Sequence, residues 1–361
     1  MKLTISTEVL QRLMARAVKG VGGDRSNPLT SLICLKLERN VLTAVTTDGV
    51  NYLYVKESCE GDDFYVVAEV EQLSKLVSKL TCEAVELTVA DKALEIKGNG
   101  KYRIELPLDE GEYVVYPDPI SEMDLANSKV SEACISSVKA VVSSLKSFLA
   151  TSFEVPCYRG YYIGESAVAT DNCIMGSVDA DLLGTAVLLS SRMLDLVSLT
   201  TADTSQVYIT DDVIAWVSPD CAVYGPLMEG LEDYPVEGIK NYLNQDMDSK
   251  CEVDKGQLLD ALGRIALFVG AYDDGVIKLT FTNKNLSIES KQSTGVETIS
   301  YLKAAKSKGF SGLTNVEELI NLVKAYPENH VKIQYGSDRA LKLAAGSLSF
   351  VIAWAAEDKE D

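Results

Sequence analysis

The chain has 361 residues, of which 47% are hydrophobic and 24% charged, as is typical of a globular protein. Its formal net charge of −19 argues against a surface that binds nucleic acid everywhere, although it leaves room for a local basic face. No apolar run is long enough to span a membrane and no signal peptide begins the chain, so we expect a cytoplasmic protein. The eight cysteines form no CxxC pair, and we expect most of them, such as Cys34 and Cys173, to be small core residues.

Periodic segments recur along the chain in a fixed order. Amphipathic patterns predict a first helix at 6–21, 131–148 and 254–270. A second helix with a shared Leu-Val step is predicted at 71–80, 191–199 and 316–326. Alternating runs separated by turn residues then predict strands at 84–106, 205–225 and 330–354. The order strand, helix, strands, helix, strands therefore occurs three times, which favours an antiparallel α+β class.

The repeat, about 120 residues long, predicts three similar domains in tandem. Polar segments place their boundaries near residues 121 and 246, giving domains at 1–121, 122–245 and 246–361.

A Thr-Asp corner occurs twice, in "TTDG" at 46–49 and in "ATDN" at 169–172. Asp48 and Asp171 belong to different copies of the repeat, so they are not predicted to form a catalytic acid pair. A Thr-Asp pair can close a tight turn through local backbone hydrogen bonds, and this is the role we expect.

Basic residues follow one face of the first predicted helix, because Arg12, Arg16 and Lys19 are spaced i, i+4 and i+7. Other cations on predicted helices are Lys75, Lys79, Lys139, Lys146, Arg192, Lys255 and Arg264. A single basic helix face is often only a solvated face. In repeated units, such faces favour one continuous surface that binds phosphate groups without reading a base sequence.

Catalytic and metal-binding patterns are absent from the sequence. His330 is the only histidine, which excludes a histidine metal cluster and a Ser-His-Asp triad. The pairs Asp62-Asp63 and Asp273-Asp274 lie in turn-like segments, where acidic residues are expected. We therefore expect no catalytic residue, no metal and no cofactor. An enzyme that uses these acidic turns is the least supported alternative.

Together, the threefold repeat, the cationic helix faces and the Thr-Asp corner resemble the bacterial replicative sliding clamp, the β-clamp processivity factor of DNA polymerase. The strongest local matches are "MKLTISTEVLQRLM", "GVGGDRSNPLTSLI", "LTAVTTDG", "VATDNCIM" and "LSFVIAW". The resemblance implies three clamp-type domains, each with two helices packed on antiparallel sheets. It also implies a head-to-tail homodimeric ring around double-stranded DNA, which tethers DNA polymerase and other replication or repair proteins and is opened by a clamp loader.

The resemblance also assigns residues. Arg25 corresponds to a family arginine near DNA, with a solvated loop arginine as the alternative. Edge strands at the dimer joint map onto 101–105 and 297–303, and the implied joint residues are Arg103, Ile104, Leu267, Phe268, Ile299 and Tyr301. The implied partner-peptide pocket comprises Thr170, Asn172, Cys173, Ile174, Met175, Tyr234, Pro235, Val236, Val351, Ala353, Trp354 and Ala355.

The pocket segments depart from the family. The usual Gly-His-Arg-Leu after Thr-Asp reads "NCIM" at 172–175, and the usual Met-Pro-Met-Arg ending reads "AWAA" at 353–356. These changes predict a divergent member with a more apolar, reshaped pocket, while plain core packing by Ile174 and Met175 is the alternative. The acidic net charge leaves a second function open: a clamp-fold scaffold for protein interactions that no longer encircles DNA.

Overall fold

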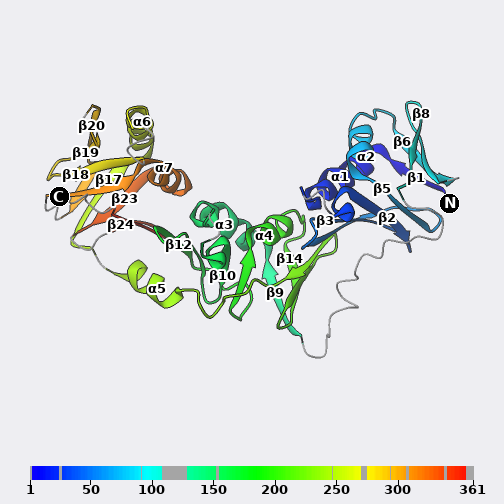
Figure 1. The fold of residues 1–361 in the computed structure, drawn as a ribbon, viewed down its shortest axis with the longest axis horizontal. Helices are drawn as coiled ribbons and strands as arrows, with labels where there is room; N and C mark the ends of the chain where they lie inside the picture. Colours follow the sequence, from blue (N-terminus) through cyan, green and yellow to red (C-terminus); the bar gives the residue numbers. More distant parts are fainter. Residues whose placement is uncertain are drawn as a thin grey trace. The chain divides into compact units, whose positions relative to one another are not determined.

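The computed structural model describes residues 2–23, 27–90, 92–107, 128–151, 154–245, 247–269, 275–292, 294–305, 309–336 and 340–354. The chain forms two compact units (Figure 1), each described by itself below. Unit 1 comprises Met1–Lys139 and Arg192–Leu227, and unit 2 comprises Ala140–Ser191 and Met228–Asp361. The middle part of the chain therefore contributes to both units. The division into three domains stays a prediction, and the boundary at residue 121 lies outside the described residues.

The predicted order of elements is confirmed in all three copies. The first copy contains β1 (Lys2–Ser6), α1 (Thr7–Ala17), β2 (Leu32–Glu38), β3 (Val41–Thr47), β4 (Tyr52–Ser58), β5 (Phe64–Glu69), α2 (Val70–Val77), β6 (Ala84–Ala90), β7 (Ala93–Lys97) and β8 (Lys101–Glu105). The second contains β9 (Lys129–Cys134), α3 (Ile135–Leu145), β10 (Gly160–Ile163), β11 (Ala167–Thr170), β12 (Ile174–Val178), β13 (Val187–Ser190), α4 (Ser191–Val197), β14 (Thr204–Ile209), β15 (Val213–Val217) and β16 (Cys221–Pro226).

The remaining residues form α5 and the third copy. Their elements are α5 (Val236–Asn244), β17 (Ser249–Asp254), α6 (Lys255–Ala266), β18 (Val276–Phe281), β19 (Asn285–Ser290), β20 (Val296–Ser300), β21 (Lys303–Ala305), β22 (Phe310–Asn315), α7 (Val316–Ala325), β23 (His330–Tyr335), β24 (Ala340–Ala345) and β25 (Leu348–Ala353). Short 3-10 helices occupy Val18–Gly20, Pro28–Ser31, Lys146–Phe148 and Pro156–Arg159.

Each unit contains two of the four sheets formed by the described residues, and the strands pair antiparallel, which confirms the α+β class. In unit 1 the strand orders are β1-β6-β7-β8 and β5-β2-β3-β4-β16-β15-β14-β9. In unit 2 they are β13-β10-β11-β12-β25-β24-β23-β17-β21 and β20-β19-β18-β22. The two long sheets are joined in the same way, since β4 pairs with β16 in unit 1 and β12 pairs with β25 in unit 2.

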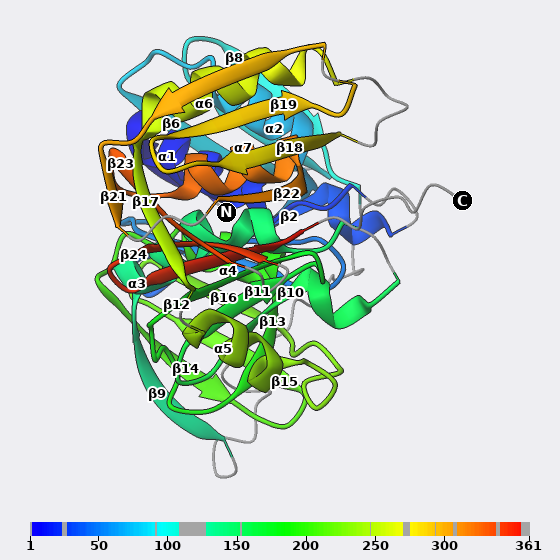
Figure 2. The ribbon, with the colours of Figure 1, turned by 90° about the vertical axis from the view of Figure 1, so that its left-hand side faces the viewer.

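The helices bury the apolar faces that their sequence periodicity predicts. α1 buries Leu10, Leu13 and Met14 and packs beside α2. In unit 2, α6 and α7 lie side by side (Figure 2), with α6 against β19 and β20 and α7 against β22. The side chains of Asp254 and Asn315 accept backbone N–H groups in the first turns of α6 and α7, which fixes where each helix begins. No helix of the described residues is long and apolar enough to cross a membrane.

Two sequence-based predictions of local structure were wrong. Ser131–Cys134 was expected to be helical, but it is the end of β9, because pairing with β14 outweighs the local periodicity. The helix α5 was not predicted, because Pro235 and the short polar segment after it have the composition of a turn. Ile239 and Leu243, four residues apart, bury the inner face of α5 and stabilise it.

Candidate DNA-facing helices and partner pocket

The first Thr-Asp corner closes the turn between β3 and β4. The Thr47 hydroxyl donates to the Asn51 carbonyl at 2.7 Å and accepts the Gly49 N–H at 3.0 Å. Asp48 Oδ1 accepts the N–H groups of Val50 at 3.0 Å and Asn51 at 2.7 Å. Gly49 has a φ of 91°, in the left-handed region that glycine favours.

The second corner repeats this geometry between β11 and β12. The Thr170 hydroxyl donates to the Ile174 carbonyl at 2.8 Å and accepts the Asn172 N–H at 3.0 Å. Asp171 Oδ1 accepts the N–H groups of Cys173 and Ile174, both at 2.8 Å. Asn172 takes the left-handed position with a φ of 84°, which asparagine tolerates better than most residues. The predicted turn-closing role is confirmed for both aspartates.

Within the described part of the chain, only the first corner holds an arginine. Arg192, on α4, donates from Nε to Asp48 Oδ2 at 3.0 Å and from its Nη2 to the carbonyls of Lys19 and Val21. The loop after α1 approaches so closely that a Cβ on Gly22 would lie 2.8 Å from the Asp48 Cα. Arg192, which was predicted to bind DNA, thus joins three segments of unit 1, although 38% of its side chain stays exposed.

The cationic face of α1 is present, but carboxylates occupy most of it. The Arg12 guanidinium binds both oxygens of Glu57, at 2.7 and 2.8 Å. Arg16 donates to Asp220 at 2.7 Å, and only 13% of its side chain is exposed. Lys19 is exposed. The sequence pattern predicted which helix face carries the cations but could not reveal Glu57 and Asp220, which come from distant strands and turns.

Two aspartates on this side of unit 1 are held in the charged form. Burial acts to raise the pKa of Asp48, but hydrogen bonds from Asn51 and Arg192 hold it below its usual range. Burial likewise opposes ionisation of Asp220, yet hydrogen bonds from Thr200 and Thr201 and the Arg16 charge bring its pKa to about 2. Arg16 and Arg192 therefore face permanent negative charges at neutral pH.

The cations predicted on and after α2, and on and after α3, are exposed. Lys75 pairs with Glu71 one turn earlier, and Lys79 lies in the turn after α2. Lys139 donates to a backbone carbonyl after α4 at 3.3 Å. Lys146 begins a 3-10 turn after α3.

The third copy uses its predicted cations within the fold. Lys255 donates from Nζ to the carbonyls of Tyr326 at 2.5 Å and Lys324 at 3.1 Å, and so satisfies the C-terminal end of α7. Arg264 forms two hydrogen bonds with Glu297, at 2.7 and 3.2 Å. Arg25, the remaining predicted DNA contact, lies outside the described residues.

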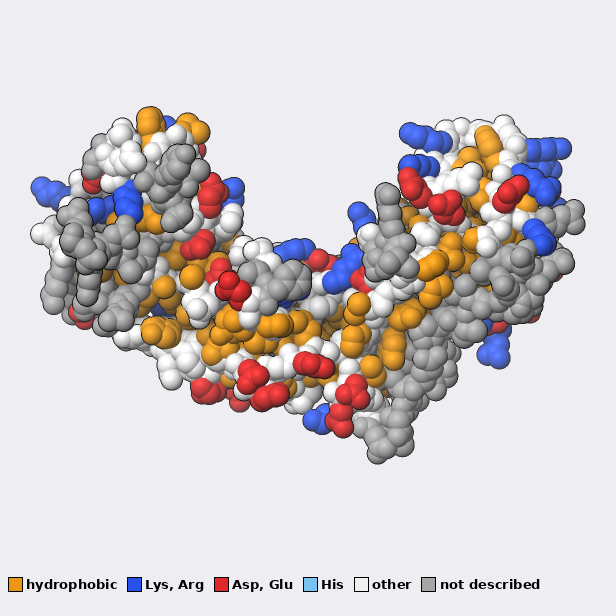
Figure 3. All heavy atoms as spheres, in the orientation of Figure 1, with side chains coloured by type: hydrophobic (Ala, Val, Ile, Leu, Met, Phe, Trp, Pro, Cys, Tyr) orange, Lys and Arg blue, Asp and Glu red, His pale blue; other side chains and the backbone are white. Residues whose placement is uncertain are grey.

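Charges of both signs are therefore interspersed around the predicted DNA-facing helices. Figure 3 shows Lys and Arg side chains alternating with Asp and Glu around α1 and α2 rather than a continuous cationic face. Each internal carboxylate weakens the field of the cation that it contacts. The remaining field comes mainly from exposed lysines such as Lys19, Lys79 and Lys139.

The residues predicted to form the partner pocket all belong to unit 2, and the structure divides them by burial. Thr170, Ile174, Tyr234 and Val351 are buried; Met175, Pro235, Val236 and Trp354 are half-buried; Asn172, Cys173 and Ala353 are exposed. Ala355 lies outside the described residues. The exposure of Cys173 contradicts the expectation that it is a core residue. It sits on the turn of the corner, where its side chain has no sheet face to pack into.

Strand pairing brings the two halves of the predicted pocket together. Met175 on β12 lies opposite Val351 on β25, and the Ala353 N–H donates to the Cys173 carbonyl at 2.9 Å. After β25 the Trp354 ring covers Gly312, whose added Cβ would lie 2.5 Å from the ring. The corner and the end of β25 therefore form one continuous surface of unit 2.

Beneath this surface lies an apolar cluster. Tyr234 stacks on Tyr162 with ring centroids 5.7 Å apart, and burial raises its pKa. The cluster also contains Val351 of β25, and Met175 and Val236 pack against it from partly exposed positions. Tyr234 is therefore a core residue, whereas Met175 and Val236 remain accessible as an apolar contact surface.

Glu318 also belongs to this surface, although the sequence analysis did not assign it to the pocket. It is half-buried on α7, and burial together with the Asp171 charge raises its pKa. The shared Leu-Val step indicated this position. When Leu196 is aligned with Leu322, Glu318 stands at the position of Arg192 in the repeat.

Three of the six predicted joint residues lie on the end strands of the two shorter sheets. Arg103 and Ile104 are on β8, and Ile299 is on β20, each the last strand in its sheet among the described residues. Tyr301 follows β20 and is half-buried. Leu267 and Phe268, after α6, are 82% and 53% exposed, and the apolar side chains of Val296 and Leu302 are exposed on the same unit.

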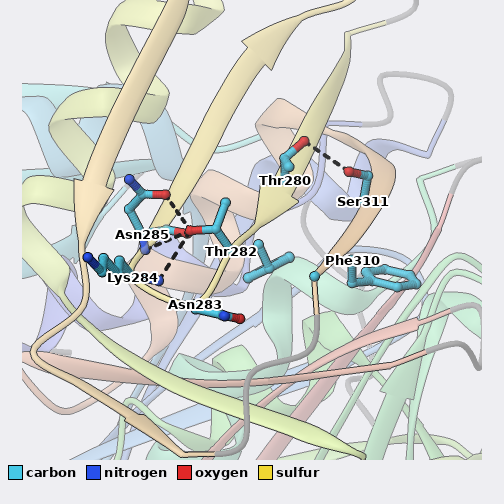
Figure 4. Close-up of a pocket in the computed structure, with 9 residues that line it drawn as sticks. Thr280, Thr282, Asn283, Lys284, Asn285, Phe310 and Ser311 are labelled. Carbon is cyan, nitrogen blue, oxygen red and sulfur yellow. Dashed lines mark hydrogen bonds between the residues drawn. The ribbon is translucent and has the colours of Figure 1, made fainter.

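A hollow of about 730 Å³ lies elsewhere on unit 2, and the sequence analysis did not predict it. It is lined by Thr280, Phe281, Thr282, Asn283, Lys284, Asn285, Gly309, Phe310 and Ser311. Its hydroxyl groups bind one another or the turn: Thr280 contacts Ser311 at 3.0 Å, and Thr282 bonds with Asn285 (Figure 4). These mutual hydrogen bonds leave it without the convergent polar groups of a ligand site.

No family model and no curated protein matches the sequence. The structure, in contrast, is similar over nearly its full length to solved sliding clamps. The DNA polymerase sliding clamp of Bacillus subtilis matches with a TM-score of 0.84 at 17% identity, covering 99% of both chains. DNA polymerase III subunit beta of Borrelia burgdorferi matches with a TM-score of 0.86 at 15% identity, also covering 99% of both. The beta subunit of Streptococcus pyogenes DNA polymerase matches at 0.84 and 18%, covering 99% of this chain and 100% of that one. The chain therefore has the fold of the bacterial DNA polymerase III beta sliding clamps.

Proposed function

We propose that this protein is a DNA sliding clamp. Two copies would join head to tail into a ring around duplex DNA, in the cytoplasm, and would tether a DNA polymerase and other replication or repair proteins without catalysing a reaction. The observation that carries the proposal is the similarity to the solved clamps over 99% of the chain, with a TM-score of 0.84 to the Bacillus subtilis protein.

Ring closure needs two complementary surfaces, and the chain offers edges of the right kind. Among the described residues β8 and β20 are the last strands of their sheets, so their outer backbone groups can pair with another strand. Leu267 and Phe268 expose an apolar patch beside the second edge, and such a patch favours a protein partner. We assign β8 of one copy and β20 of the other to the joint, with Leu267 and Phe268 as its apolar contact.

We assign the DNA contact to the exposed lysines rather than to the arginines that form ion pairs with carboxylates. Lys19, Lys79 and Lys139 are exposed residues, whereas Arg12, Arg16, Arg192 and Arg264 are bound to carboxylates. Contacts from lysine to phosphate carry affinity without base readout, as sliding requires.

The partner pocket is assigned to the surface formed by the second corner and the end of β25. Met175 and Val236 supply apolar contact area there, and the departures "NCIM" and "AWAA" alter its chemistry. DNA polymerase and the clamp loader are the partners that we propose for it.

Topological retention on DNA tests the proposal. After loading, a ring stays on a closed circular plasmid and slides off the same plasmid once it has been cut. Release that does not depend on cutting would overturn the ring. The matched variant Leu267→Asp with Phe268→Asp should lower the solution mass from dimer to monomer and abolish retention, because two charges would then lie in the apolar joint.

Charge reversal tests the DNA-facing assignment. Lys19→Glu with Lys79→Glu should weaken DNA association and lower the slope of log K against log salt by roughly one per residue. Lys36→Glu, an exposed lysine on β2 that pairs with Glu38, is the matched control and should leave the slope unchanged. Equal effects of both changes would argue against a local DNA-facing surface.

A clamp-fold scaffold that does not encircle DNA is the second candidate, and the net charge of −19 together with the internal pairing of the arginines favours it. Solution mass separates the two functions, since a scaffold can act as a monomer of 39.2 kDa whereas a ring needs two copies.

A further inference from the structure

The two Thr-Asp corners of this chain differ in the charge that faces their aspartates. In unit 1 the guanidinium of Arg192 donates to Asp48 at 3.0 Å. In unit 2 the same hydrogen-bonded turn presents Asp171, and the aligned position on α7 carries Glu318. The same corner is thus built twice, and among the described residues only the first copy holds a cation.

The missing cation is not supplied elsewhere in the described part of unit 2. No lysine or arginine of the described residues forms an ion pair with Asp171 or Glu318. Both carboxylates are half-buried, and each lies within electrostatic reach of Cys173. Two half-buried carboxylates without a counter-charge repel one another and attract an external cation.

An apolar surface adjoins the two carboxylates. The backbone of Cys173 is bonded to Ala353, next to Trp354, and Met175 follows on β12. A ligand that satisfies this surface must offer apolar side chains and a positive charge close together. A peptide segment of a protein partner has that chemistry, and arginine has the planar donor geometry that carboxylates bind best.

We propose that the partner pocket of this protein selects peptides that place an arginine beside their apolar anchor, with Asp171 and Glu318 receiving its guanidinium. The inference rests on the proposed function, because it names the peptide chemistry of the same pocket. It is supported by the first corner, where an arginine of the chain itself occupies the equivalent position.

Fluorescence anisotropy with the full-length protein tests this. The probe is the common bacterial clamp-binding peptide, labelled with fluorescein, in a panel that places arginine or its neutral isostere citrulline at each position flanking the apolar anchors. We expect arginine at one flanking position to tighten binding by about three- to tenfold over citrulline, and we expect added salt to reduce the difference.

Variants on α7 locate the effect. Glu318→Gln should reduce the arginine advantage to about twofold or less, and Glu318→Arg should abolish it, because the new arginine would occupy the corner itself. Glu317→Gln is the matched control, since Glu317 is the exposed preceding residue on the same helix. The control should keep the full advantage of the wild type.

The possible outcomes distinguish a failure of the arginine preference from a failure of the proposed peptide pocket. Equal binding of arginine and citrulline peptides overturns the inference and leaves a peptide pocket in place. An arginine advantage that persists undiminished in Glu318→Gln also overturns it. If no peptide of the panel binds, the pocket itself is refuted, and the inference falls with it.

Discussion

The corners at Asp48 and Asp171 share the hydrogen bonds of the threonine hydroxyl and those from the backbone to the aspartate. They differ in the Asn51 side chain, which donates to Asp48 in the first corner only, and in the helix residue that faces each turn. Both threonine hydroxyls donate to the carbonyl four residues later, and both aspartates accept two N–H groups. Arg192 faces the first corner, and Glu318 faces the second. The same turn occurs twice because the backbone between the two strands needs these hydrogen bonds in each copy. The charge of the helix residue that faces the turn differs between the copies and can determine what each corner binds.

Closure of the first corner has a structural consequence. Arg192 connects α4 to the β3–β4 turn and to the loop after α1, three segments that are distant in sequence. The second corner has no such connection among the described residues, so its two carboxylates remain available to a ligand. One corner stabilises the fold, and the other is suited to recognition.

The largest difference is expected when each aspartate is removed. Asp48→Ala leaves two N–H groups of the turn and the Arg192 guanidinium without their acceptor, and should lower the free energy of unfolding by roughly 2–3 kcal/mol. Asp171→Ala should cost about 1 kcal/mol, because the loss of two hydrogen bonds is partly offset by relief of repulsion with Glu318. Urea denaturation measures both.

Because the chain forms two units, hydrogen exchange should accompany the denaturation measurements. The loss of protection should be local to the β3–β4 turn in Asp48→Ala and to the β11–β12 turn in Asp171→Ala. Equal destabilisation by the two changes would contradict the comparison of the corners.

A smaller effect is expected for Arg192→Met, which keeps the length of the side chain and removes its donors. Unfolding free energy should fall by about 1–2 kcal/mol, and exchange should accelerate at residues 19–23, because their carbonyl contacts are lost. Arg12→Met is the control for an exposed ion pair and should change stability by less than about 1 kcal/mol. A similar loss in both variants would mean that Arg192 does not hold the loop.

How far the sequence predicts the structure depends on the range of the interaction. The repeat, the α+β class and the turn-closing role of Asp48 and Asp171 follow from local periodicity and turn chemistry, and the structure confirms them. Ion pairing depends on distant partners: nothing near Arg16 in the sequence points to Asp220. The pattern of α1 therefore predicted a cationic face but could not predict its neutralisation.

The candidate pocket shows the same limit. A family resemblance places Tyr234 in the pocket, but its ring is buried against Tyr162, a contact set by strand and helix packing. Glu318 lies within electrostatic reach of Asp171 although α7 and the β11–β12 turn are distant in sequence, and only the alignment of Leu196 with Leu322 indicated this. Internal repeats are thus a source of long-range information that a single sequence otherwise lacks.

The smallest effect, and the sharpest test of the comparison, is Glu318→Arg, which places an arginine at the second corner as in the first. Removal of the repulsion and formation of an ion pair with Asp171 should raise the free energy of unfolding by about 0.5–1 kcal/mol at pH 7. Glu318→Gln removes only the repulsion and should give about half of that gain.

The stability difference between Glu318→Gln and the wild type should change with pH in a definite direction. The pKa of Glu318 is raised in the folded protein, so the folded state holds its proton more tightly than the unfolded state does. Glu318 therefore contributes stability below about pH 4.3, the ordinary glutamate pKa, and loses that contribution as pH rises through its raised folded pKa. The advantage of Glu318→Gln over the wild type should accordingly be greatest near neutral pH and shrink as pH falls to about 4. A constant advantage across this range would mean that neither burial nor the Asp171 charge raises the pKa of Glu318, and the second corner would then differ from the first in sequence but not in electrostatics.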